Sequence, residues 1–286
     1  MPNKKTELIL ESVETAKLQG TTHKAKTNVV REKACTVTTV EIKTDEDAKK
    51  LSRKKGVYVT VEMEKVFEIT DEDFESIILT VAKTLRSMIK IQNNQRVLIV
   101  GIGNRNVTPD SLGPKCVDRI IVTRGLEKTM PELISKDGFG NVCAINANVF
   151  GVTGIESAEL IKGITKTISP ALVIVVDALA TNTVSRLFKT VQISDTSLTP
   201  GAGVNNEREE IDPGCPMISI GVPTLMSVSS ILQKEGVNVD DFTENLVAIP
   251  MNVDLATDLA AKLIAFSLNK VFHYDMQTEE ILKFLY

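Results

Sequence analysis

The feature that most restricts the fold is a series of four short apolar segments, each bounded by turn residues and separated by stretches of helix length. They occupy residues 97–102 (VLIVGI), 142–147 (VCAINA), 172–177 (LVIVVD) and 217–220 (MISI). A strand that is apolar throughout is buried on both faces, so this order predicts a mostly parallel sheet between helical layers. Helices are expected at 114–124, after Pro114, and at 156–168, before Pro170.

Antiparallel strands are predicted ahead of this core. Residues 29–42 and 57–63 have strand-like alternation on either side of a charged turn, which is typical of an antiparallel pair. A helical stripe follows Thr70, and the last strong helix begins near Asp254 and is expected to cover one face of the sheet. A further strand at 189–194 is expected to pair at a sheet edge.

Length and composition agree with one folded unit. The chain has 286 residues, of which 43% are hydrophobic and 24% charged, so it can bury a large core. We expect a single α/β domain over residues 1–286. Within it, 71–286 form a three-layer α/β/α core with a mostly parallel central sheet, and 1–70 form an N-terminal antiparallel β-rich extension.

The charge balance and the lack of long apolar stretches restrict the partners. Lys and Arg number 33 and Asp and Glu 37, so the net charge is −4, which excludes a polybasic protein that binds nucleic acid or a membrane surface. No apolar stretch reaches the roughly 18 residues of a membrane span, and the N-terminus lacks the apolar core of a signal peptide. We therefore expect a cytoplasmic protein with no membrane partner and no direct nucleic-acid partner.

Two aspartates follow predicted strands at positions where open α/β sheets bind ligands. Asp110 lies in the loop after strand 97–102, shortly before a predicted helix, and Asp177 is the last residue of strand 172–177. Such loops converge beyond the carboxyl ends of the strands, and two neighbouring carboxylates can act as general acid and general base. The alternative interpretation is that Asp110 caps a helix and that Asp177 ends its strand by bonding a turn.

The sequence has few other segments or residues that could form a functional site. Residues 194–208 form a long loop with Gly and Pro, which is either a substrate-binding or gating loop or a surface loop. Gly101 and Gly103 follow a strand, but Asn106 occupies the third glycine position of a dinucleotide-binding fingerprint, so that match is weak. A buried structural role is favoured for Cys116, because the sequence supplies no adjacent base.

Histidine and cysteine usage argues against a metal. Only His23 and His273 are present, near opposite ends of the chain, and the 4 cysteines form no CxxC or Cys/His cluster. We therefore predict a site without a metal or another cofactor.

Several motifs resemble the germination protease family of spore-forming bacteria. They include TPDSLGPK, DALA and ISDTSLTPGAGV, in this order within residues 95–225, and GVYVTVEM nearer the N-terminus. The resemblance implies an atypical aspartic-type endopeptidase that degrades small acid-soluble, DNA-protecting spore proteins during germination. It further implies a homotetramer, made as a zymogen and located in the forespore or spore core, whose fold is similar to that of the hydrogenase maturation proteases.

The family's two essential aspartates match Asp110 and Asp177, the residues that the strand topology also selects. The peptide is expected to be positioned by residues of the loops around them. These are Asn104, Arg105, Thr108, Arg186, Asp195, Gly201, Gly203 and Arg208.

Departures from the family's pattern support an alternative. Gly125 and Thr199 stand where the family has histidines, and Ser227 stands where it has an aspartate. The alternative is a catalytically degenerate paralogue that acts as a binding or regulatory protein. A metal-dependent maturation peptidase ranks third, because residues 24–272 contain no histidine. Only Met1 to Lys4 precede the segment where the family's mature chain begins, so little or no propeptide is expected.

Overall fold

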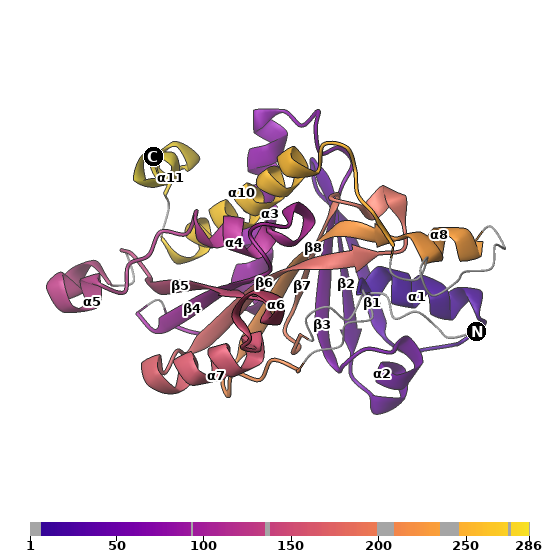
Figure 1. The fold of residues 1–286 in the computed structure, drawn as a ribbon, viewed down its shortest axis with the longest axis horizontal. Helices are drawn as coiled ribbons and strands as arrows, with labels where there is room; N and C mark the ends of the chain where they lie inside the picture. The colour runs from indigo at the N-terminus through magenta and orange to yellow at the C-terminus, as the bar shows by residue number, and fades with distance from the viewer. Residues whose placement is uncertain are drawn as a thin grey trace.

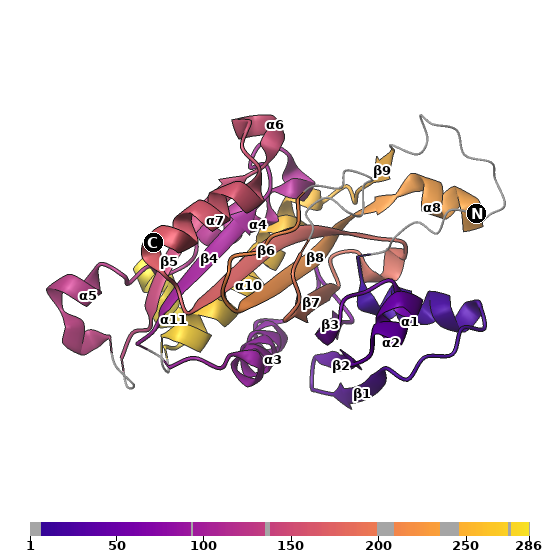
Figure 2. The ribbon, with the colours of Figure 1, turned by 90° about the horizontal axis from the view of Figure 1, so that it is seen from below.

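A computed structural model describes residues 7–92, 94–134, 138–198, 209–234, 246–273 and 276–285. Its strands form one sheet in the order β1-β2-β3-β7-β8-β6-β4-β5 (Figure 1), and β9, labelled in Figure 2, pairs with β8. The strands are β1 (Lys26–Arg31), β2 (Cys35–Ile42), β3 (Gly56–Met63), β4 (Arg96–Ile102), β5 (Asn141–Asn148), β6 (Leu172–Thr181), β7 (Thr190–Ser194), β8 (Met217–Ser227) and β9 (Val247–Ala248).

The sheet has a parallel half and an antiparallel half. Strands β8, β6, β4 and β5 run parallel to one another. Strand β7 pairs antiparallel with both β8 and β3, and β2 and β1 continue the antiparallel half. The predicted N-terminal antiparallel strands are therefore confirmed, and they extend the same sheet as the parallel core.

Helices cover both faces of the sheet, as a three-layer fold requires. On one face α3 and α4 pack against α10; on the other, α7 covers the parallel strands and α1 and α2 cover the antiparallel ones (Figure 1 and Figure 2). The helices are α1 (Ile9–Leu18), α2 (Asp45–Leu51), α3 (Asp71–Met88), α4 (Leu112–Val117), α5 (Leu126–Thr129), α6 (Phe150–Thr153), α7 (Ser157–Ile168), α8 (Val228–Lys234), α10 (Val253–Phe272) and α11 (Thr278–Leu285). Short 3₁₀ helices are η1 (Thr108–Asp110), η2 (Pro131–Leu133) and η3 (Val184–Arg186).

Alternating side chains of the parallel strands fill both cores. In β4, Val97 and Ile99 belong to the core that includes α3 and α10, whereas Leu98 and Val100 belong to the core that includes α7. Burial on both faces is the reason that these strands are continuous apolar runs in the sequence. The predicted α/β class with a mostly parallel centre is therefore confirmed.

The long helices begin close to their predicted starts. Helix α3 follows Thr70, whose Oγ1 accepts a hydrogen bond from the Asp73 amide at 3.1 Å and so caps the first turn. Helix α7 begins at Ser157 and α10 at Val253, each within a residue of the start expected from the sequence.

Strand β6 is longer than the sequence indicated. It continues past Asp177 to Thr181, so the prediction that the strand ends on Asp177 is wrong. Its last residues pair with β8, which also extends further than expected, to Ser227. A register shift between Leu179 and Ala180 marks a bulge in this pairing. The polar side chain of Asp177 interrupts the apolar run, so the sequence pattern indicates a strand end there. The backbone pairing of β6 with β8 nevertheless continues to Thr181.

Two further predictions are wrong. Strand β7 lies inside the sheet between β3 and β8 rather than at an edge, because the N-terminal strands pair with it across a long sequence separation. The helix expected at 114–124 is the short α4. Asn269 of α10 donates to the Arg119 carbonyl oxygen at 2.8 Å and accepts from the Ile121 amide at 3.0 Å, so backbone groups that would continue the helix are bonded to another element.

His273 at the end of α10 makes the stability of the fold dependent on pH. The side chain is 1% exposed, and burial lowers its pKa from 6.5 to about 4. Its Nε2 bonds the Ile121 carbonyl oxygen at 2.9 Å, whereas Nδ1 has no hydrogen-bond partner among the described residues. Protonation therefore places an uncompensated charge in the core.

Acidification from pH 7 to pH 5 is expected to lower the free energy of unfolding by about 2 kcal/mol through this residue. Between the two pKa values the unfolded chain binds a proton that the folded chain does not, so this stability is present above pH 6.5 and lost as the pH falls toward 4. Urea unfolding of wild type and His273→Gln at both pH values measures the difference. Equal losses in the two proteins would contradict the assignment to His273.

Candidate active site

Asp110 closes the loop that follows β4. The loop turns back through η1, and the Asp110 Oδ2 accepts a hydrogen bond from the Asn104 amide at 2.7 Å. Gly103 permits this close approach, because its φ is +127° and a Cβ there would lie 1.9 Å from the Asp110 carbonyl oxygen. Ser111, not Asp110, occupies the N-cap of α4. The half-buried Asp110 carboxylate therefore holds the loop at the end of β4 rather than capping a helix.

Asp177 lies within β6 and is 5% exposed. Its Oδ1 accepts a hydrogen bond from the Ala178 amide at 2.9 Å. Its neighbour in register on β8 is Gly221, whose own neighbour on β7 is Gln192. Strand alternation places the Asp177 side chain on the face that α7 covers, because Val175 packs there.

The turn that carries Asp110 packs on the strand that carries Asp177. The last pair between β4 and β6 joins Gly101 to Val176, so Asp177 lies one residue beyond it. A Cβ on Gly113, at the start of α4, would lie 2.7 Å from the Val176 carbonyl oxygen, and η1 contacts both β6 and β8. The structure thus places both aspartates at the same edge of the sheet, where adjacent parallel strands bind ligands in this class of fold.

Three residues predicted to position a peptide share the loop of Asp110. Asn104 supplies the amide that Asp110 accepts, and Thr108 begins η1. The exposed Arg105 forms a two-pronged ion pair with Asp118, with Nη2 and Oδ1 2.8 Å apart. Their hydrogen bonds raise the pKa of Arg105 and lower that of Asp118. The structure therefore gathers these three residues beside Asp110.

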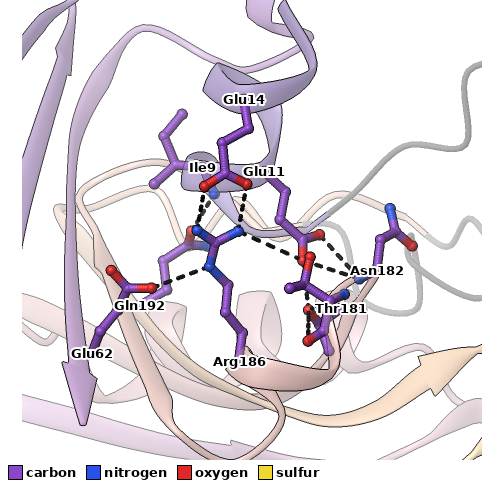
Figure 3. Close-up of polar contacts among 9 residues, drawn as sticks. Ile9, Glu11, Glu14, Glu62, Thr181, Asn182, Arg186 and Gln192 are labelled. Carbon is purple, nitrogen blue, oxygen red and sulfur yellow. Dashed lines mark hydrogen bonds and ion pairs between the residues drawn. The ribbon is translucent and has the colours of Figure 1, made fainter. Parts of the chain in front are cut away.

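Arg186 is placed differently from the expectation that it positions the peptide. It is buried in η3, and its guanidinium is paired with three carboxylates of the chain itself, as Figure 3 shows. Nη1 lies 2.8 Å from Glu14 and 4.0 Å from Glu11, and Nε donates to Glu62 at 3.1 Å. Hydrogen bonding to Glu14 is the main cause of the raised pKa of Arg186. Arg186 therefore joins the N-terminal helix to the segment after β6.

Asp195 lies away from the two central aspartates. Strand β7 runs antiparallel to β8, so its carboxyl end lies toward the amino ends of the parallel strands. There the Asp195 Oδ1 accepts a hydrogen bond from the Val57 amide at 2.7 Å and ties the strand end to β3. Gly201, Gly203 and Arg208, also predicted to position the peptide, lie outside the described residues.

Sequence reasoning missed a polar cluster between the N-terminal segment and the end of β6. Glu7 and Glu11 bond backbone amides of β6 and the residue after it, and Gln192 of β7 bonds the backbone at the start of α1. The signal in the sequence is the spacing of Glu11 and Glu14, since residues three apart lie on one helix face. The apolar pattern at the start of the chain does not by itself predict α1, so the sequence does not bring these carboxylates together.

Neither a metal cluster nor a membrane span is found in the part of the chain that the structure describes. No group of three or more His, Cys, Asp or Glu side chains there is arranged to hold an ion. None of its helices has the length and apolarity needed to cross a bilayer.

The family model and the curated relatives that match this chain are all germination proteases. The family model for germination protease matches residues 4–240. The germination protease of Clostridium perfringens is 34% identical over 328 aligned residues, covering 100% of both chains. That of Priestia megaterium is 42% identical over 206 residues, covering 70% of this chain and 55% of its own. Among solved structures, a NiFe hydrogenase maturation protease of Thermococcus kodakarensis matches with a TM-score of 0.38 and 20% identity, over 65% of this chain and 99% of that one.

The family model matches most of this chain, the Clostridium perfringens relative shares its full length with it, and the protein is accordingly an α/β peptidase. It belongs to the germination protease family.

Proposed function

We propose that this chain is an endopeptidase that starts the degradation of small acid-soluble spore proteins during germination, with Asp110 and Asp177 as its acid and base. The observation that carries the proposal is that both residues lie at one edge of the sheet in a member of the germination protease family, Asp110 in the loop after β4 and Asp177 one residue beyond the last pair of β4 with β6. We further propose that the protein works in the spore core as a homotetramer.

The chemistry needs one ionised and one protonated carboxyl group. The ionised group takes a proton from water while the water oxygen attacks the scissile carbonyl carbon. The protonated group gives its proton to the amide nitrogen as the C–N bond breaks, so the products are a carboxylic acid and an amine. Two like charges close together do not both ionise readily, and the pair therefore predicts a bell-shaped dependence of kcat/KM on pH.

We expect the substrate to present an extended segment, because both aspartates lie at the sheet edge where η1, the turn that carries Asp110, contacts β6 and β8. A spore protein bound to DNA does not offer such a segment freely. We expect DNA to protect the substrate from cleavage, and Asn104, Arg105 and Thr108 to contact the peptide.

The test is a mass-spectrometric time course with a purified small acid-soluble spore protein, run with and without a chelator and with and without duplex DNA. Specific fragments that form equally fast with the chelator, and more slowly with DNA, are expected. Cleavage abolished by the chelator would favour the metal-dependent alternative. Binding without cleavage under all four conditions would make the protein a degenerate relative that recognises its partner.

One structural observation favours that degenerate alternative. At the end of β8, where the family has an aspartate, the buried Ser227 hydroxyl bonds the Ser229 hydroxyl at 2.7 Å. A pair of hydroxyl groups thus occupies the position where the resemblance implies an aspartate. The time course decides between an active enzyme that tolerates this change and a binding protein.

A further inference from the structure

We propose that Glu11 of the N-terminal helix is a positioning residue that fixes the strand carrying Asp177; this proposal rests on the proposed function of Asp177. Glu11 is 4% exposed and belongs to α1, far from Asp177 in the sequence. Figure 3 shows its carboxylate directed at the end of β6.

The carboxylate of Glu11 bonds two successive residues at the end of β6. Its Oε1 accepts from the Thr181 hydroxyl at 2.6 Å, and both of its oxygens lie 3.1 Å from the Asn182 amide nitrogen. Glu7 acts in the same way one step earlier, where its Oε2 accepts from the Ala180 amide at 2.5 Å. Two backbone amides in this segment therefore donate hydrogen bonds to side chains from the N-terminal segment.

The segment needs such support because the ladder is irregular there. The register between β6 and β8 shifts after Leu179, and strand β4 ends before this level. A bulge disrupts the backbone pairing and bends the strand, so its course is set by whatever holds the amides. Hydrogen bonds from an amide to an ionised carboxylate are about twice as strong as those between neutral groups. Glu11 therefore determines how β6 continues after Asp177.

The N-terminal helix is itself anchored from two sides. The Gln192 side chain accepts from the Ile9 amide at 2.6 Å and donates to the Glu7 carbonyl oxygen at 2.9 Å. Arg186 pairs with Glu14 one helical turn after Glu11. Because α1 is bonded to both β7 and η3, its position is fixed, and the Glu11 carboxylate can hold the end of β6 in one place.

Ala178 connects the end of β6, which Glu11 holds, to the carboxylate of Asp177. The Ala178 amide is bonded by Asp177, so the orientation of the Asp177 carboxylate depends on the backbone immediately after it. A displacement of a reacting group by about 1 Å can cost about 100-fold in rate. Loss of the Glu11 charge is therefore expected to lower kcat by about 10-fold and to leave KM nearly unchanged.

The experiment compares Glu11→Gln with Glu46→Gln in the whole chain. Glu46 lies on the neighbouring helix α2, is 72% exposed and bonds Lys50 of the same helix at 2.6 Å rather than the strand. Steady-state kinetics is combined with amide hydrogen exchange measured by NMR, because exchange at Ala178, Ala180 and Asn182 reports the strand end directly. We expect Glu11→Gln to raise exchange at all three amides by about 10-fold and to lower kcat, and Glu46→Gln to do neither.

The exchange data separate failure of this proposal from failure of the proposed function. Unchanged exchange at Ala178 in Glu11→Gln would overturn the positioning role, even in a protein that cleaves nothing. Faster exchange with a wild-type kcat would also overturn it, because the strand end would then matter only for structure. If Glu11→Gln exchanges faster but the wild-type protein cleaves nothing, Glu11 still holds the end of β6, and only the peptidase assignment is rejected.

Discussion

Asp177→Asn is expected to lower kcat for peptide cleavage by about 10²- to 10⁴-fold, which is the usual contribution of a general acid or base. Asparagine has the same shape and keeps an oxygen for the Ala178 amide, so the strand is expected to retain its course. It does not exchange a proton at neutral pH. The same argument applies to Asp110→Asn, in which the amide oxygen still accepts from Asn104. Kinetics and thermal unfolding of both variants measure the two effects separately.

A matched control for these variants is Asp47→Asn. Asp47 is also buried and also accepts a backbone hydrogen bond, from the Lys24 amide at 2.7 Å, but it lies on α2 under the antiparallel half of the sheet. Its replacement is expected to change kcat by less than about twofold, as substitutions outside an active site usually affect stability instead. A wild-type kcat in Asp110→Asn or Asp177→Asn would remove that aspartate from the mechanism.

The parallel half of the fold could be predicted because its physical cause is visible in the sequence. Strands buried on both faces need apolar side chains at every position, as Leu98 and Ile99 illustrate by packing into opposite cores. The position of the two aspartates follows from the same fact, since parallel strands place their carboxyl ends at one edge. Asp110 and Asp177 could therefore be assigned to one edge of the sheet without any knowledge of side-chain contacts.

The antiparallel half could not be predicted in the same detail, because its organisation depends on pairings between distant segments. Nothing local to β7 distinguishes an edge strand from one that pairs with both β3 and β8. The roles of Glu11 and Arg186 are hidden for the same reason. In the sequence, each has the pattern of a charged residue on the surface. Their contacts become visible only in the structure, where α1 packs against the end of β6.

Gly103→Ala is expected to lower kcat by about 100-fold, the cost of a misplacement of about 1 Å, although residue 103 carries no chemical group. The backbone of Gly103 has a φ of +127°, which residues with a Cβ rarely adopt. The added Cβ would lie 1.9 Å from the Asp110 carbonyl oxygen and 3.3 Å from the Asp110 Oδ1. The turn must move away from β4, and Asp110 must move with it.

Stability is expected to fall as well, by about 1–3 kcal/mol, because both backbone strain and overpacking are introduced. The control is Gly163→Ala within α7, where a Cβ meets no atom within 4 Å among the described residues. Alanine there is expected to stabilise the helix by about 0.5–1 kcal/mol and to leave kcat unchanged. Urea unfolding and kinetics of the two variants are measured together. A Gly103→Ala protein with normal kcat would show that Asp110 does not need its present position, and the acid and base assignment of the pair would then be wrong.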